Sequence, residues 1–175
     1  TMKTHITILF IFIFTISCTT EPESELSVNN LNTVLNEDLQ EEVKLTYEDG
    51  SPKLIMFFQM VDNQKQIYSI KMYDQEAKQS FEGIYEYGIT EHTLDNAFAS
   101  VKTEEPSIPD GFYKMYYNGK LDSEGFIENN KEHGLHTFYY SDQKVRRKLT
   151  YSNGKIIEDK FYDIDGSETE IFIQG

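Results

Sequence analysis

Gly111-Phe-Tyr-Lys-Met-Tyr-Tyr117 recurs 23 residues later in the chain as Gly134-Leu-His-Thr-Phe-Tyr-Tyr140. A turn signal follows each copy, and then come a lysine and an aliphatic residue, as Lys120-Leu121 and Lys144-Val145. Aromatic and β-branched residues favour strands, so each copy predicts a strand that enters a hairpin. A regular period of about 24 residues indicates a repeat architecture in which each unit holds two strands.

Turn dipeptides extend this period over most of the chain. Asn-Gly and Asp-Gly supply the positive φ angles that two-residue hairpin turns require, and turns at this spacing predict consecutive antiparallel strands. The sequence therefore predicts a mainly β fold, an antiparallel β-meander of successive hairpins. The turns are expected at Asp49-Gly50, Asp62-Asn63, Asp74-Gln75, a looser one near Gly88, Asn118-Gly119, Asn129-Asn130, Asp142-Gln143, Asn153-Gly154 and Asp165-Gly166.

These repeats resemble a known family. Asn118-Gly119-Lys120-Leu121 and Asn153-Gly154-Lys155-Ile156 match the turn of the MORN repeat variant, whose copies read roughly Gly-x-aromatic-x-x-Tyr-Tyr-x-(Asn/Asp)-Gly-Lys-Leu. The clear resemblance covers residues 111–166, and a fainter one extends back to about residue 43. Ser141-Asp142-Gln143 departs from the pattern because it lacks glycine. The resemblance implies a repeat sheet, and an antitoxin-like role as well, because proteins similar to this family are often described as antitoxin components.

The first residues have the layout of a bacterial lipoprotein signal peptide. Met2-Lys3-Thr4-His5 precedes an apolar segment at 6–16, and a serine stands directly before the only cysteine, Cys18. Spanning a bilayer takes about 20 apolar residues, whereas this segment has the length of a cleavable signal. We therefore expect residues 1–17 to be the signal peptide and Cys18 to be acylated. An ordinary secreted protein is the alternative, since Thr15 stands where the lipobox usually has leucine.

A tether and a single β-repeat domain are expected after the signal. Residues 18–42 begin as an acidic, proline-containing stretch typical of a disordered spacer. Residues 43–175 are predicted to form the β-repeat domain, interrupted at 89–110 by an excursion of one or two helical turns and a loop. A short helix is predicted within 26–41 from the helical spacing of Val28, Leu31, Val34, Leu35 and Leu39.

Charge and cysteine content exclude several classes of function. The net charge of −14 opposes binding to nucleic acid phosphates and to anionic lipid headgroups. Membrane attachment is therefore expected only through acyl chains on Cys18, of which two or more anchor stably. No second cysteine is present to form an internal disulfide, so stability has to come from the core and the sheet. No cofactor is expected.

Alternation along the two repeated strands separates two faces. The set of Tyr113, Met115 and Tyr117, matched by His136, Phe138 and Tyr140, is the more uniformly large and is assigned to the better-buried face. The other set is mixed, as expected of a partly solvated face. It predicts a candidate binding strip, because tyrosine combines a large contact area with a hydrogen-bonding tip. The alternative is that these rings only ladder across neighbouring strands. The strip consists of Phe112, Tyr116, Leu135 and Tyr139.

The sequence offers no constellation of catalytic residues. His133 and His136 fall on opposite faces of a strand, and His136 is interpreted as a core histidine. Asp163-Ile-Asp165-Gly166 would need a carboxylate where Phe161 stands in order to be a calcium loop, and no serine lies in a Gly-x-Ser-x-Gly elbow. The only basic cluster, at 144–148, is expected to pair with nearby carboxylates, with a docking patch for an acidic partner as the alternative. An enzyme and a metal site are not expected.

Together these features predict a lipid-anchored protein of the bacterial cell envelope. It is expected in the outer membrane or facing the periplasm, with the cell surface as a further alternative. Its sheet is expected to act as a non-catalytic module that binds a protein partner or another envelope component. The first alternative is an antitoxin or immunity-type protein that neutralises a toxin by direct binding. The second alternative is an enzyme of unrecognised class.

Overall fold

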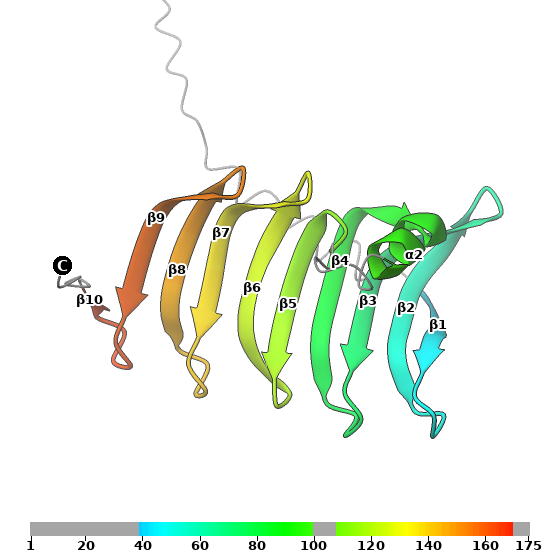
Figure 1. Ribbon diagram of the computed structural model, residues 1–175, viewed down its shortest axis with the longest axis horizontal. Helices are drawn as coiled ribbons and strands as arrows, with labels where there is room; N and C mark the ends of the chain where they lie inside the picture. The colour runs from blue at the N-terminus through cyan, green and yellow to red at the C-terminus, as the bar shows by residue number, and fades with distance from the viewer. Residues whose placement is uncertain (1–38, 100–107, 170–175) are drawn as a thin grey trace, which may run out of the picture.

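The structure is a computed structural model, and it describes residues 39–99 and 108–169. Ten strands form one sheet whose order in space follows the order in sequence (Figure 1). All neighbouring strands are antiparallel. The prediction of a mainly β fold, a meander of successive hairpins, is therefore confirmed. The expected signal peptide at 1–17, Cys18 and the tether up to residue 38 lie outside the described residues.

Four strands precede the helix of the described ranges, and six follow it. The first group is β1 (Gln40–Thr46), β2 (Pro52–Val61), β3 (Gln64–Tyr73) and β4 (Gln79–Thr90), with α2 (Glu91–Ala99) after it. The second group is β5 (Gly111–Tyr117), β6 (Lys120–Glu128), β7 (Lys131–Tyr139), β8 (Val145–Ser152), β9 (Lys155–Tyr162) and β10 (Glu168–Thr169). The sheet continues across the excursion predicted at 89–110, because β4 pairs directly with β5.

Most of the predicted turns have the expected backbone geometry. Both central residues have positive φ in the two-residue turns Asp62-Asn63, Asn118-Gly119, Asn129-Asn130 and Asn153-Gly154. Each longer loop has one such residue, with φ of 84, 58, 70 and 88° at Gly50, Ala77, Gln143 and Gly166. The N–H of Gln143 donates to the carbonyl of Tyr140 at 2.9 Å, as that of Gly50 does to Tyr47 at 3.0 Å. The loop that lacks glycine therefore keeps the same turn.

The looser turn expected near Gly88 is a bulge within β4 and not a hairpin. The ladder between β3 and β4 skips from Ile84 to Ile89, so residues 85–88 bulge out of it. Gly88 has a φ of 67°, which is why the local signal resembles a turn. The bulge directs Tyr85 into the core, where its side chain is only 2% exposed. The strand continues to Thr90 because its ladder with β3 resumes after the bulge, with Ile89 opposite Ile67 and Thr90 opposite Gln66.

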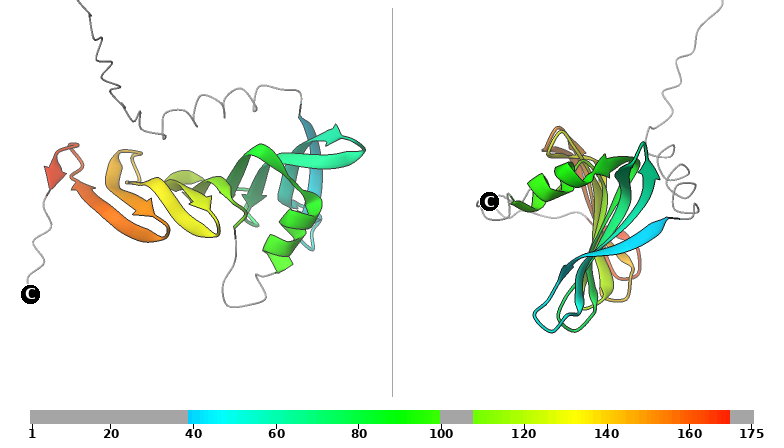
Figure 2. Two further views of the ribbon diagram at one scale, coloured as in Figure 1. Left: turned by 90° about the horizontal axis from the view of Figure 1, so that it is seen from above. Right: turned by 90° about the vertical axis from the view of Figure 1, so that its right-hand side faces the viewer.

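One face of the sheet carries the core, over β2, β3 and β4. Its fully buried aliphatic side chains are Leu54, Met56, Ile67 and Ile70. Tyr85 of β4 and Leu94 of α2 belong to the same cluster. The helix α2 lies across this face (Figures 1 and 2). The helix begins after Thr90, whose Oγ1 accepts a hydrogen bond from the N–H of Thr93 at 3.1 Å and so caps the first turn. Ile89 and Thr90 belong to β4, so the excursion starts later than predicted.

The assignment of the better-buried face holds for one repeated strand and is wrong for part of the other. In β7, His136 is 2% exposed, and the next two members of its set are half-buried. In β5, Tyr113 packs against the core cluster, but Met115 and Tyr117 are 41% and 73% exposed. The reason is that α2 contacts mainly β3 and β4, so no described element covers the end of β5 near its turn.

The first strand begins earlier than the sequence indicated. Gln40 and Glu41 end the range 26–41 in which a helix was predicted, but they pair with Phe58 and Phe57 of β2. The edge of β2 supplies hydrogen-bond partners for this backbone, whereas a short helix in water is only marginally stable. Residues 40–42 therefore belong to the sheet rather than to the tether. The rest of the predicted helix lies outside the described residues.

The two ends of the sheet are built alike. Tyr47 after β1 and Tyr140 after β7 each donate their hydroxyl to a backbone carbonyl of the strand after next, at 2.8 Å. The following strand then bulges at an equivalent residue, which is Lys53 in β2 and Arg146 in β8. The same side-chain hydrogen bond and the same bulge thus recur in two units of the sheet, as expected of the repeat that the turn spacing predicts.

Candidate functional site

The predicted binding strip lies on the face of the sheet opposite α2. Phe112 and Tyr116 come from β5, Leu135 and Tyr139 come from β7, and β6 runs between them. Phe126 of β6 pairs with Phe112 and continues the row of rings. Leu135 is 44% exposed, and the three rings are half-buried. No element within 39–99 or 108–169 crosses this face, which leaves it open to a partner on the described part of the chain.

Each tyrosine of the strip is held by a glutamate on the preceding strand. Tyr116 donates its hydroxyl to Oε2 of Glu82 at 3.1 Å, and Tyr139 donates to Oε1 of Glu124 at 2.5 Å. Burial, reinforced by the adjacent carboxylate, raises the pKa of both hydroxyls well above the ordinary value of 10. Both therefore remain protonated donors at neutral pH. These two hydrogen bonds, each made to a neighbouring strand, fix the orientation of both rings.

Charges alternate in sign along the same face. Glu82 stands between Lys71 and Lys114, whose ammonium groups lie 3.8 and 4.0 Å from its carboxylate. Glu124 follows as the cross-strand partner of Lys114. Beyond β6 the equivalent positions hold Thr137, Lys148 and Lys160. The row of alternating charges thus ends in two lysines at the C-terminal end of the sheet.

A chain of rings runs along the other face, from the core toward the C-terminal strands. Phe81 stacks on Tyr113 with centroids 6.5 Å apart, Tyr113 meets His136 at 5.7 Å, and His136 meets Tyr151 at 4.7 Å. Nδ1 of His136 lies 3.2 Å from the Tyr113 hydroxyl, and Nε2 lies 3.1 Å from the carbonyl of Phe126. Burial lowers the pKa of His136. The interpretation of His136 as a core histidine is confirmed.

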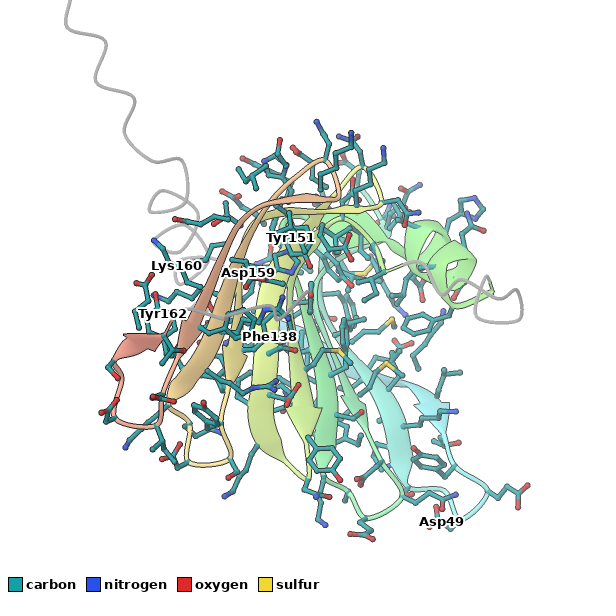
Figure 3. All side chains as sticks on the ribbon, turned by 60° about the vertical axis from the view of Figure 1, so that its left-hand side comes forward. Asp49, Phe138, Tyr151, Asp159, Lys160 and Tyr162 are labelled. Atoms are coloured by element: carbon teal, nitrogen blue, oxygen red, sulfur yellow. The ribbon has the colours of Figure 1, made fainter. Side chains whose placement is uncertain are left out.

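A cleft of about 370 Å³ opens at the C-terminal end of the sheet. Figure 3 labels two of its lining residues, Phe138 on β7 and Tyr162 on β9, on the side of the sheet away from Asp49. Aromatic walls with a few polar groups are typical of sites for small ligands or side chains. The cleft is lined by Phe138, Tyr140, Arg146, Arg147, Phe161, Tyr162, Asp163 and Thr169. Its existence was not predicted, although the basic run at 144–148 was recognised in the sequence.

The two arginines of the cleft have different surroundings. Arg147 donates to both carboxylate oxygens of Asp159, at 2.9 and 2.7 Å, and its guanidinium lies 4.5 Å from the ring centroid of Phe161. Arg146 is exposed, and its side chain makes no ion pair or hydrogen bond with any described residue. The expectation that the basic run at 144–148 pairs with carboxylates therefore holds for Arg147 and for Lys144, which lies 3.7 Å from Asp142. It is wrong for Arg146 and Lys148, which form no ion pair with a described carboxylate.

Within the described ranges, no group of three or more histidine, cysteine, aspartate or glutamate side chains is placed to hold a metal ion. Nδ1 of His133 lies 3.4 Å from the carboxylate of Glu128. Asp165 accepts hydrogen bonds from the N–H and hydroxyl of Ser167, so its carboxylate serves the turn. Among the same residues, no helix has the length and apolar character needed to cross a bilayer.

Comparison with known proteins places the chain in no family. No family model and no curated protein matches it. Among solved structures it is similar to the crystal structure of TarM, and to that of an S. aureus TarM mutant in complex with fondaparinux, α-GlcNAc-glycerol and UDP. In both matches the identity is 10%, the TM-score is 0.30, and 83% of this chain is covered. The chain spans 20% of the TarM chains, and likeness at this level carries no conclusion about function.

Proposed function

We propose that this protein is a non-catalytic binding module of the bacterial cell envelope, held by a lipid on Cys18, that presents one face of its sheet to a partner. The observation that best supports this proposal is the strip of Phe112, Tyr116, Leu135 and Tyr139, on a face that no described element crosses. Aromatic residues, tyrosine among them, are enriched in protein interfaces. The partner is a protein or another component of the envelope.

The fixed orientation of the strip tyrosines strengthens the case for binding. Tyr116 and Tyr139 are held by Glu82 and Glu124 before any partner arrives. A side chain that is already ordered loses little conformational entropy on association. A preorganised aromatic surface of this kind gains more from contact with a partner than a set of free surface rings does.

The proposed anchor accounts for how the module reaches its partner. The 22 residue-to-residue steps from Cys18 to Gln40 span at most about 75 Å when fully extended. The sheet can therefore act at a distance from the lipid surface. The protein's net charge of −14 also opposes direct binding of the sheet to anionic lipid headgroups. Mass spectrometry of the mature protein tests the anchor: the proposal requires an acylated Cys18, and an unmodified Cys18 still joined to residues 1–17 would overturn it.

Affinity capture from envelope extracts tests the binding role of the strip. The bait is the mature protein, compared with a variant carrying Tyr116→Ser and Tyr139→Ser. The matched control carries Tyr87→Ser and Tyr117→Ser, which removes two tyrosines that are 81% and 73% exposed but outside the strip. Circular dichroism verifies that all three proteins are folded, and Leu135→Glu serves as a second strip variant if the tyrosine pair unfolds.

The capture experiment has distinct outcomes. We expect a partner that is retained by the wild type and by the control, and lost from the strip variant. Equal retention by all three proteins, or no specific partner at all, would refute the role of the strip. If the partner is a toxin whose activity falls on binding, the antitoxin-like role implied by the MORN-variant resemblance is the form that this binding takes.

A further inference from the structure

We propose that the cleft between β7 and β10 docks an acidic peptide segment of a protein partner, and that Arg146 pairs with its carboxylate. The cleft shares no residue with the binding strip, so this inference goes beyond the proposed function and adds a second contact surface. Both arginines face the cleft, one of them is already paired inside the protein, and the charge at this end of the sheet is less negative than in the rest of the chain.

A bulge brings both arginines to one cleft. Adjacent residues of a regular strand point to opposite faces, yet Arg146 and Arg147 both line the cavity. The register between β7 and β8 steps from Arg147 to Val145 and leaves Arg146 as the extra residue of the bulge, a device that re-aims side chains. The bulge therefore brings the guanidinium of Arg146 into the cleft beside that of Arg147, whereas a regular strand would direct Arg146 to the opposite face.

The cleft occupies a level of the sheet that is packed into the core at β2 and β4. One register row crosses the sheet on the face that carries α2. Its members on β2 and β4, Leu54 and Phe81, are 0% and 8% exposed in the core. On β8 the same row holds Arg147, which Asp159 balances through two hydrogen bonds. With this pair formed inside the protein, Arg146 is left to pair with a group from outside.

Local charge favours an acidic occupant. Residues 144–169 contain six basic and five acidic side chains, in a chain whose net charge is −14. Lys148 lies on the opposite face of β8 and does not line the cleft, but it adds an unpaired positive charge to this end of the sheet, because it forms no ion pair with a described carboxylate. An acidic segment is thus attracted to this end of the sheet and repelled by the rest of the surface.

The lining residues define the chemistry of the occupant. A guanidinium binds a carboxylate through two parallel hydrogen bonds, and Arg146 has its donors free for this. Phe138 and Tyr140 offer apolar surface beside it, and tyrosine and arginine are the residues that most often dominate binding energy at interfaces. Asp163 on the same lining repels a second carboxylate. The segment that fits is therefore a glutamate or aspartate next to an aromatic or aliphatic residue.

Fluorescence anisotropy with the full mature protein tests the proposal. The probe is a labelled, capped Phe-Glu-Phe peptide, and its control is the uncharged Phe-Gln-Phe peptide. We expect Arg146→Ala to weaken binding of the acidic probe at least about tenfold and Arg146→Lys to weaken it less. Lys53→Ala is the matched control, since it removes a cation from the equivalent bulge at the other end of the sheet and is expected to leave affinity unchanged.

The outcomes separate this proposal from its rivals. Equal affinity for the two peptides, no binding of the acidic peptide, or binding that survives Arg146→Ala would overturn it. Arg146-dependent binding of oligogalacturonate in place of the peptide would assign the cleft to an acidic glycan and overturn the peptide assignment. The strip variant Tyr116→Ser with Tyr139→Ser should bind the probe like the wild type, so a failure of the strip and a failure of the cleft are distinguishable.

Discussion

The imidazole of His136 lies across the backbone of Gly125, so closely that a Cβ on Gly125 would be 2.5 Å from Nδ1. Gly125 is not among the residues with positive φ, so its backbone conformation is open to any residue. The glycine is required by the ring and not by a turn. It lets His136 join Tyr113 and Tyr151 in the chain of rings that extends the core.

Substitution of Gly125 therefore tests the packing of this ring chain. Gly125→Ala is expected to lower the free energy of unfolding by about 1–3 kcal/mol, the usual cost of overpacking a buried site. In the double variant with His136→Ala the ring that clashes is gone. The double variant should therefore lose less free energy of unfolding than the sum of the losses in the two single variants. Urea denaturation followed by circular dichroism measures both. Full additivity would show that the contact does not limit residue 125.

The buried imidazole predicts a loss of stability on mild acidification. Burial holds the pKa of His136 below its ordinary value of 6.5, so below about pH 6.5 the unfolded chain binds a proton that the folded chain does not. The free energy of unfolding is then fully retained above this pH and decreases as the pH falls below it. Hydrogen bonds from Ser51 and Ser167 lower the pKa values of Asp49 and Asp165. The stability that these two carboxylates provide is therefore retained at pH 5.5 and is lost only as the pH falls below about 4.

Urea titrations at pH 7.0 and pH 5.5 measure this effect. The wild type should be less stable at pH 5.5, and His136→Phe should remove most of the difference between the two conditions. The same decrease in the wild type and in His136→Phe would assign the pH dependence to other groups. Because the comparison uses differences within each protein, it is independent of the overall stability of the variant.

The longer loops offer a matched pair of substitutions. Gly50 and Ala77 occupy equivalent positions with φ of 84 and 58°, a region that disfavours residues with a Cβ. Gly50→Ala is expected to lower the free energy of unfolding by about 1 kcal/mol, although nothing lies within 4 Å of its Cβ. Ala77→Gly should raise the free energy of unfolding, because glycine adopts this φ without strain. The expected gain is only about 0.5 kcal/mol, because glycine also adds conformational freedom to the unfolded chain, which opposes folding. Thermal denaturation resolves both, and changes of the same sign would contradict the assignment.

Local signals explain which parts of the fold could be predicted from sequence. Asn118-Gly119 and Asn153-Gly154 specify positive φ at two successive residues, which is a property of the dipeptides themselves. Gly88 carries the same kind of signal, but its role as part of a bulge depends on the burial of Tyr85 in a cluster with residues distant in sequence, such as Leu54. The exposure of Met115 likewise depends on how far α2 reaches, which no local pattern records.

The candidate site was predicted in part for the same reason. Tyr116 and Tyr139 fall on one face by simple alternation, so the strip could be named from the sequence. Their pairing with Glu82 and Glu124 needed the register between strands. The cleft needed more, because it exists only when the bulge at Arg146 is combined with residues of three further segments. The basic run was a visible sign of it, but adjacent charges in a strand predict opposite faces.

Photo-crosslinking from the two faces of the sheet in intact cells shows which face meets the partner. Leu135 and Met115 are 44% and 41% exposed, and they lie on opposite faces of neighbouring hairpins. Each is replaced in turn by p-benzoylphenylalanine in the otherwise native protein. We expect one specific protein adduct from position 135 and little or none from position 115. Equal adducts from both positions, or an adduct from position 115 alone, would show that the strip is not the surface through which this module binds.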